Sequence, residues 1–228
     1  MARASSFLDR INSISGVRAG FIGRVDGVPV DFDKWETLGR LEPEHRRVVE
    51  EMGFSWGSLW RAEQIHGDGV AVVPCAESGS EQIVSSVDGV VTGCEDTLLG
   101  IYVADCAAVF LADPDTGALA LVHSGKKGTE AGIATKAVQI LIDEFGSKPE
   151  RLEAAVSPCI RPPHYELDFV VDIERQLGEA GVPSEQVVVS GVCTGEQVDA
   201  YYSYRVEKGK TGRMLALLGR IGKTASTR

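Results

Sequence analysis

Three residues in the sequence have the types that suit a catalytic metal site. His66, Cys106 and His123 each stand singly in an apolar setting. Two imidazoles and a thiolate are soft ligands, which select zinc or copper over magnesium and calcium. Catalytic zinc sites use three protein ligands and keep a fourth position open. The set therefore predicts a zinc site, with copper as the less favoured metal.

Other interpretations of the same residues need no metal. Cysteine is often a small buried hydrophobe, and the spacing matches neither Cys-x-x-Cys nor His-Glu-x-x-His. A Cys106 thiolate with His123 as its base would instead be the pair of a metal-independent cysteine hydrolase. The local sequence leaves these alternatives open.

A glycine- and lysine-rich segment follows His123 directly and predicts an anion site. Ser124-Gly125-Lys126-Lys127-Gly128-Thr129 stands between an apolar run and a helical pattern. Free N–H groups at a helix N-terminus attract anions, and the lysines add positive charge. Tyr202-Ser203-Tyr204-Arg205 and Lys210-Thr211-Gly212-Arg213 could also line a pocket, although an ordinary strand with an exposed turn explains them equally.

A predicted β-hairpin explains how Cys106 and His123 could meet. Residues 107–112 and 118–123 are short apolar runs, and the turn sequence Asp113-Pro114-Asp115-Thr116-Gly117 separates them. Cys106 and His123 then become cross-strand neighbours at the open end of the hairpin. Asp105 is expected to be a proton shuttle or to orient a ligand imidazole.

The remaining pattern predicts an α+β fold in a single domain spanning residues 1–228, with a mixed β-sheet core and β-hairpins covered by helices. Strands are expected at 17–23, 59–65, 70–73, 88–92, 98–104, 152–157, 186–190, 201–205 and 213–218. Helices are expected at 43–52, 129–145 and 168–180. Residues 1–16 and 220–228 are expected to be peripheral or frayed.

Composition narrows the classes of function. The net charge of −10 disfavours binding to nucleic acid or an anionic membrane. No run approaches the roughly 18 apolar residues of a membrane span, and the N-terminus lacks the apolar stretch of a signal peptide. Five scattered cysteines then predict reduced thiols in a cytoplasmic protein.

Several motifs together resemble a known family. They are Gln64-Ile65-His66-Gly67, Asp88-Gly89-Val90-Val91-Thr92, Ala104-Asp105-Cys106, His123-Ser124-Gly125-Lys126-Lys127-Gly128-Thr129, Ser157-Pro158-Cys159-Ile160, Tyr202-Ser203-Tyr204-Arg205 and Thr211-Gly212-Arg213. Their types and order are similar to those of the YfiH/YlmD-type proteins, a family labelled polyphenol oxidase or laccase domain and also purine nucleoside phosphorylase. The resemblance covers residues 17 to 218.

The resemblance implies a zinc site on His66, Cys106 and His123. It also implies phosphorolysis of purine nucleosides, including methylthioadenosine, and deamination of adenosine, with nucleoside and phosphate as partners. The catalytic group would be Cys106, His66, His123 and Asp105. Substrate and phosphate would be bound by Arg24, Gln64, Gly125, Lys126, Lys127 and Arg205.

Two sequence features set this chain apart, one from multicopper laccases and one from the usual motif of the family. A multicopper laccase needs about ten histidines for its copper centres, and this chain has four. The family usually carries a tryptophan and an arginine where Lys126 and Lys127 stand here. Lysine holds an anion as a point charge without the bidentate fork of arginine. A divergent member that keeps the metal but has lost turnover is therefore a third alternative.

Overall fold

The computed structural model describes residues 6–76 and 81–222 and arranges the strands in two mixed sheets. The first sheet consists, in spatial order, of β1 (Val17–Ile22), β11 (Met214–Arg220), β6 (Leu98–Val103), β2 (Leu59–Ala62) and β4 (Gln82–Val84). The second consists of β10 (Val187–Val189), β9 (Glu153–Val156), β7 (Ala107–Ala112), β8 (Leu119–Ser124), β5 (Gly89–Thr92) and β3 (Val70–Val72). Each sheet contains parallel and antiparallel pairs.

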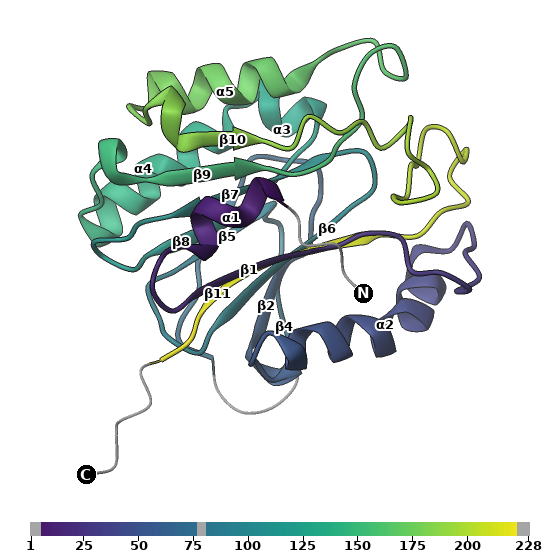
Figure 1. Ribbon diagram of the computed structural model, residues 1–228, viewed down its shortest axis with the longest axis horizontal. Helices are drawn as coiled ribbons and strands as arrows, with labels where there is room; N and C mark the ends of the chain where they lie inside the picture. Colours follow the sequence, from purple (N-terminus) through teal and green to yellow (C-terminus); the bar gives the residue numbers. More distant parts are fainter. Residues whose placement is uncertain (1–5, 77–80, 223–228) are drawn as a thin grey trace.

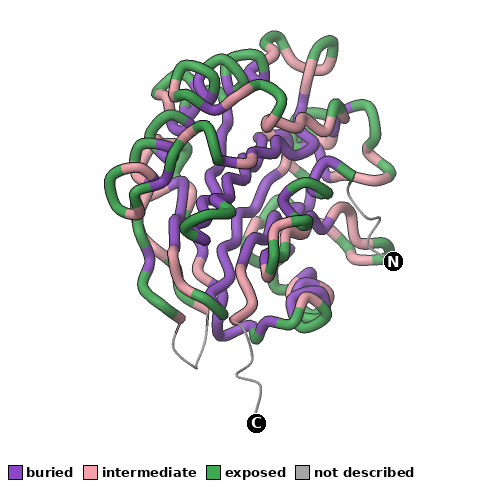
Figure 2. Tube along the Cα trace, turned by 60° about the vertical axis from the view of Figure 1, so that its left-hand side comes forward, coloured by how far each residue is buried: buried purple, intermediate pink, exposed green. Residues whose placement is uncertain are grey.

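The sheets and helices stack in the order helix, sheet, sheet, helix (Figure 1). The helices are α1 (Asp9–Asn12), α2 (Lys34–Glu51), α3 (Lys126–Glu130), α4 (Ile133–Phe145) and α5 (Phe169–Glu179). Helices α4 and α5 cover the second sheet, and α2 packs on the first. Figure 2 shows the strands as a buried centre, with exposed residues on the surrounding helices and loops. The α+β class with a mixed sheet core is confirmed.

Strand β8 shows how alternation places a functional residue. Leu119 and Leu121 face the first sheet, whereas Ala120 and Val122 face α4. Successive side chains of a strand point to opposite faces, so the next residue, His123, continues the row that faces the first sheet. The side chain of His123 therefore lies at the end of the layer of side chains that packs between the two sheets.

The hairpin predicted from its turn is confirmed. Strands β7 and β8 pair antiparallel, and Ala108 lies opposite His123. The carboxylate of Asp113 accepts hydrogen bonds from the backbone N–H of Asp115 and the hydroxyl of Thr116. The next turn residue, Gly117, has a φ of +77°, which only glycine adopts readily. Local turn chemistry therefore closes the end of the hairpin opposite Cys106.

Two expected helices have different boundaries. The one expected from residue 43 begins at Lys34, because Asp33 caps it by accepting the N–H groups of Trp35 and Glu36. The one expected over 129–145 is divided into α3 and α4 at Gly132, which has a φ of +79°. The lysine pair consequently lies inside α3 and not in a loop before the helix.

Two further expectations are wrong. Residues 201–205, expected as a strand, instead have irregular structure that leads into the turns of residues 204–209. The side chain of Glu207 accepts hydrogen bonds from Ser203 N–H and the Thr211 hydroxyl, which offers the backbone an alternative to a strand ladder. Residues 6–16, expected at the periphery, place Phe7, Leu8 and Ile11 in the core between the sheets. Residues 1–5 and 223–228 lie outside the described residues.

The expectation of five reduced cysteines is also corrected. Cys75 and Cys94 form a disulfide with a Cα–Cα distance of 5.2 Å. Cys75 and Cys94 follow the paired strands β3 and β5. Because these strands are parallel, with Val72 opposite Val91, both thiols lie at the same end of the strand pair. Cys106, Cys159 and Cys193 are free. In the two described stretches, no helix combines the length and apolar character needed to cross a membrane.

Candidate active site

The structure brings His66, Cys106 and His123 together at the open end of the β7–β8 hairpin. One ligand atom from each lies within 4.8 Å of the others. The two imidazole rings are nearly perpendicular, at 84°, with centroids 4.9 Å apart. Ligand atoms on a tetrahedral zinc ion are about 3.5 Å from one another, given Zn–N and Zn–S bonds of about 2.0–2.3 Å. The cluster is thus close to the spacing that holds a metal ion.

A strained loop presents His66. Gln64 and His66 both have left-handed backbone conformations, with φ of 65° and 62°. Such conformations are costly for residues other than glycine and persist only where surrounding contacts fix them. The side-chain amide of Gln64 supplies one such contact, because it donates to the Tyr102 carbonyl at 2.5 Å and accepts from the Tyr102 N–H at 2.9 Å. Gln64 therefore ties the loop to β6.

The buried carboxylate of Asp88 supplies the other contacts that fix the loop of His66. One oxygen accepts from His66 N–H at 2.9 Å, and the other accepts from Gly67 N–H at 2.7 Å and Ile65 N–H at 3.2 Å. The first oxygen also lies 2.8 Å from Nδ1 of His123. A carboxylate that accepts a hydrogen bond from Nδ1 fixes the tautomer of the ring and leaves Nε2 available to bind a metal ion. One side chain thus positions both imidazoles.

Sequence reasoning gave this orienting role, or that of a proton shuttle, to Asp105. The Asp105 carboxylate lines the pocket described below, but it accepts hydrogen bonds from the Thr194 hydroxyl and the Arg205 N–H, both at 2.7 Å. The role of Asp88 was missed. The signal was a charged residue directly before the buried apolar run of β5, where a carboxylate needs several hydrogen-bond donors.

Cys106 and His123 form an electrostatically coupled pair. Burial opposes the Cys106 thiolate, but the charge and hydrogen bonds of His123 and His66 outweigh it and lower the pKa of the thiol to about 6. Burial likewise opposes the His123 cation, but the thiolate and the Asp88 carboxylate raise the pKa of His123 to about 9. Thiolate is the form of cysteine that binds metals or attacks a substrate.

Gly125 provides the space for the thiol. A Cβ built on Gly125 would lie 2.5 Å from Sγ of Cys106, closer than van der Waals contact allows. Its φ of −96° is open to other residues, so the requirement for glycine is steric and comes from the thiol. Gly125 is also the N-cap residue directly before α3, which carries the lysine pair.

The three ligand-type residues line a pocket of about 570 Å³, which is within the range of small-molecule sites. Aromatic rings form part of its wall, from Tyr102, Tyr165, Phe169 and Tyr204. Four basic side chains also line it, namely Lys34, Lys126, Arg205 and Arg213. An aromatic wall beside several cations suits a flat ring system that carries or accompanies an anion.

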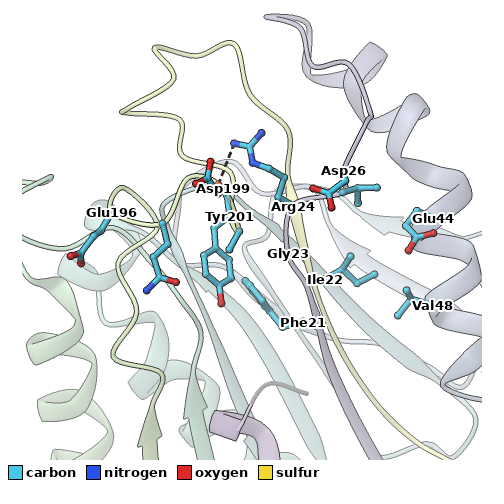
Figure 3. Close-up of a pocket in the computed structure, with 13 residues that line it drawn as sticks. Phe21, Ile22, Gly23, Arg24, Asp26, Glu44, Val48, Glu196, Asp199 and Tyr201 are labelled. Carbon is cyan, nitrogen blue, oxygen red and sulfur yellow. Dashed lines mark hydrogen bonds between the residues drawn. The ribbon is translucent and has the colours of Figure 1, made fainter. Parts of the chain in front are cut away.

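Two residues predicted to bind phosphate lie elsewhere. Lys127 is exposed on α3 and is not among the pocket-lining residues. Arg24 lines a second cavity of about 800 Å³, beside Asp26 and Tyr201 (Figure 3). Its guanidinium is bound by the Glu207 carboxylate at 2.7 Å and lies 4.3 Å from the Tyr202 ring centroid. The structure therefore does not bring Arg24 and Lys127 to the metal-type cluster.

Several pocket residues were not found from the sequence. Tyr165 and Phe169 stand before and at the start of α5, where the pattern showed only the helix. Lys34 reaches the pocket from the first residue of α2, and no local motif marked it. By contrast, Gln64, Lys126 and Arg205, which were predicted to bind substrate or phosphate, do line this pocket.

Comparison with known proteins places this site in a family. A family model described as multi-copper polyphenol oxidoreductase laccase matches residues 36–173 and 164–221. A purine nucleoside phosphorylase of Deinococcus radiodurans is 32% identical over 92% of this chain and 91% of that protein. The purine nucleoside phosphorylase YlmD of Geobacillus stearothermophilus is 29% identical over 85% of this chain and 82% of that protein.

The fold agrees with the sequence relatives. The crystal structure of YlmD from Geobacillus stearothermophilus superimposes with a TM-score of 0.77 at 27% identity, covering 92% of this chain and 93% of that one. The crystal structure of the Bacillus licheniformis protein YfiH superimposes with a TM-score of 0.76 at 24% identity, a likeness that supports the fold alone. The two relatives named above are both called purine nucleoside phosphorylases. The family match and these relatives together show that the chain belongs to the multi-copper polyphenol oxidoreductase laccase family.

Proposed function

We propose that the protein is a zinc-dependent purine nucleoside phosphorylase. The observation that carries the proposal is one pocket that combines the His66–Cys106–His123 cluster, an aromatic wall and basic side chains. The relatives named purine nucleoside phosphorylase support the same reaction. The partners would be a purine nucleoside and phosphate, with no role for nucleic acid or a membrane.

The donor set fits zinc. Two imidazole nitrogens and a thiolate match the ligands of catalytic zinc, and Asp88 gives His123 the carboxylate partner typical of such histidines. Copper is the less favoured occupant. When bound, zinc would supply a Lewis acid at the pocket floor, able to stabilise negative charge on a substrate.

The chain's own residues would bind and orient the substrates. Tyr165, Phe169 and Tyr204 offer ring faces for the purine, and the basic side chains would hold phosphate. In phosphorolysis a phosphate oxygen bonds to C1′ of the ribose as the C1′–N9 bond breaks. The base leaves with that electron pair and takes up the proton that hydrogen phosphate gives up, and Asp105 in the pocket wall is the proposed shuttle for that proton.

Gln64 and Gly125, predicted as binding residues, would act through others. Both polar atoms of the Gln64 amide are engaged by Tyr102, and Gly125 faces the Cys106 thiol. We propose that they shape the site for substrate. Lys127, outside the pocket, would contribute charge only at a distance.

Product analysis tests the reaction. Zinc-loaded protein incubated with adenosine and phosphate should yield adenine and ribose 1-phosphate, and methylthioadenosine should be cleaved in the same way. Inosine formed without phosphate would instead reveal adenosine deamination, the second activity proposed for this pocket. Absence of phosphate-dependent adenine from the whole panel would contradict phosphorolysis and favour a member that binds metal without turnover.

One observation favours a second candidate, a metal-independent cysteine hydrolase. The lowered pKa of Cys106 and the raised pKa of His123 are those of a thiolate–imidazolium pair. Removal of metal by a chelator separates the candidates. A zinc enzyme loses turnover and regains it when zinc is returned, whereas a thiol hydrolase keeps turnover without metal and loses it to iodoacetamide.

The cytoplasmic location expected from the sequence stays a prediction. The Cys75–Cys94 disulfide departs from the usual state of cytoplasmic thiols, which are kept reduced. Counting free thiols in the freshly isolated protein would show which state prevails: three free thiols agree with the disulfide, and five agree with the original expectation.

A further inference from the structure

We propose that Lys34 and Arg213 form the anion subsite of this pocket and hold inorganic phosphate across from the His66–Cys106–His123 cluster. The inference rests on the proposed phosphorolysis and assigns its second substrate to two side chains. Lys34 is the first residue of α2, which packs on the first sheet, and Arg213 directly precedes β11 of that sheet. His123 and Cys106 belong to the hairpin of the second sheet.

Arg213 differs from the other arginines that the protein withdraws from solvent. Within residues 6–76 and 81–222, the buried and half-buried arginines other than Arg213 each have a carboxylate partner: Arg24 with Glu207, Arg61 with Glu81, Arg161 with Asp168, and Arg220 with Glu95. Arg213 donates only to the carbonyl oxygens of Thr211, at 3.5 Å, and Gly212, at 2.8 Å. No ion pair joins it to a described carboxylate.

A half-buried guanidinium without a direct ion-pair partner is costly, because burial removes water that would otherwise solvate it. Burial lowers the pKa of Arg213 and outweighs the opposing influence of Tyr204, Cys106 and Asp105, so these groups compensate the buried cation only in part. The Tyr204 ring, whose centroid lies 5.7 Å from the guanidinium carbon, gives some support. Both carbonyl contacts of Arg213 come from Nη1, so its Nε and Nη2 groups remain available for two parallel hydrogen bonds to phosphate.

Lys34 brings a second unpaired cation to the same wall. Burial lowers its pKa, and repulsion from the positive charges of Arg213 and Arg61 lowers it further, while the Glu63 carboxylate opposes the shift. Its ammonium lies 5.0 Å from the centroid of the Trp35 ring, and none of the described carboxylates forms an ion pair with it. A bound dianion between Lys34 and Arg213 would convert this repulsion into two attractive contacts.

The other basic side chains fit this role less well. Arg205 bonds Glu166 at 3.3 Å and stacks on Tyr165, with 4.7 Å between its guanidinium carbon and the ring centroid. Lys126 is exposed, so water screens its charge. Arg24 is bound by Glu207 in the other cavity. Lys34 and Arg213 are the pair that combines burial, a free donor set and a shared cavity.

The test uses zinc-loaded full-length protein and the variants Arg213→Gln and Lys34→Gln. Arg18→Gln and Lys148→Gln, which remove exposed charges outside the pocket, are the matched controls. We expect each pocket variant to raise the KM for phosphate about 10- to 100-fold, the range for losing a hydrogen bond to a charged group. The KM for adenosine and the zinc content should stay within about twofold, and Arg213→Lys should recover part of the loss.

A second readout does not depend on turnover. Calorimetric titration with inorganic phosphate should give binding to the parent protein and about 10- to 100-fold weaker binding to both pocket variants. This titration tests the phosphate subsite even if the parent protein does not cleave nucleosides. Failure to cleave nucleosides would contradict the proposed function but not the subsite. Phosphorolysis with an unchanged phosphate KM in both variants would overturn the subsite and leave the function standing.

A parallel titration with adenosine monophosphate separates two sources of the same anion. The inference expects the variants to weaken binding of inorganic phosphate. It is overturned if they weaken only the binding of the nucleotide, or if the parent protein binds no phosphate at all. Thermal unfolding of each variant, Arg213→Lys included, compared with that of the parent protein, identifies losses that come from misfolding.

Discussion

Replacing Asp88 by asparagine tests whether one buried carboxylate sets the geometry of the metal-type cluster. Its oxygens accept the N–H groups of Ile65, His66 and Gly67 and contact Nδ1 of His123. Asparagine keeps one oxygen but places an NH₂ donor where the second oxygen was. That donor then faces other donors, and the negative charge is lost.

The structure allows the size of the effect to be worked out. If the amide oxygen stays with His66 and His123, the N–H groups of Ile65 and Gly67 lose their acceptor. A buried donor left unpaired costs about 1–3 kcal/mol; because these two N–H groups are only partly buried, the free energy of unfolding should fall by about 2 kcal/mol. Loss of the carboxylate that orients a ligand histidine should weaken zinc binding about 10- to 100-fold.

Asp113→Asn is the matched control. Asp113 is as buried as Asp88 and accepts several hydrogen bonds, but it lies in the turn at the far end of the β7–β8 hairpin. Urea unfolding should show a loss of stability in both variants. Competition for zinc with a coloured chelator should show weaker binding only in Asp88→Asn. Zinc affinity within twofold of the parent protein in Asp88→Asn would refute the reasoning.

Three further predictions concern other features of the fold. Gly125→Ala should fold but bind zinc at least about tenfold more weakly, because its Cβ would lie 2.5 Å from the Cys106 thiol; an unchanged zinc titration would contradict this. Burial lowers the pKa of His45 from 6.5 to about 4. As the pH falls from 6.5 towards 4, this histidine therefore becomes protonated in the unfolded chain but stays neutral in the folded protein, which favours unfolding. The parent protein should lose about 2 kcal/mol between pH 7 and pH 5 from this residue, and urea unfolding of His45→Gln should show a correspondingly flatter profile; parallel profiles would disprove it. Cys75→Ser should lower the free energy of unfolding by about 3 kcal/mol and abolish the effect of dithiothreitol, since the disulfide with Cys94 spans 19 residues; equal unfolding curves with and without reductant in the parent protein would rule out the bond.

The parts of the site that could be predicted from the sequence are those that local chemistry determines. The turn at Asp113–Gly117 is encoded by residues that favour turns, and it brings Cys106 and His123 to one end of the hairpin. His66 could be placed only through the family resemblance, because its position depends on hydrogen bonds from its loop to Asp88, 22 residues away along the chain.

The residues that sequence reasoning misplaced depend on contacts between distant segments. Arg24 looked free to bind phosphate, but its partner Glu207 lies 183 residues further on. Lys34 carried no motif and reaches the pocket only because α2 begins earlier than Pro43 suggested. The turns around Glu207 replaced an expected strand because side-chain hydrogen bonds outcompeted the ladder there.

The central claim is that His66, Cys106 and His123 hold the zinc ion on which activity depends. Elemental analysis of the purified parent protein, His66→Ala and Cys106→Ala, each checked for folding by its thermal unfolding curve, tests it most directly. The account predicts one zinc per chain in the parent protein and no stoichiometric zinc in either folded variant. Unchanged zinc in both variants would contradict it.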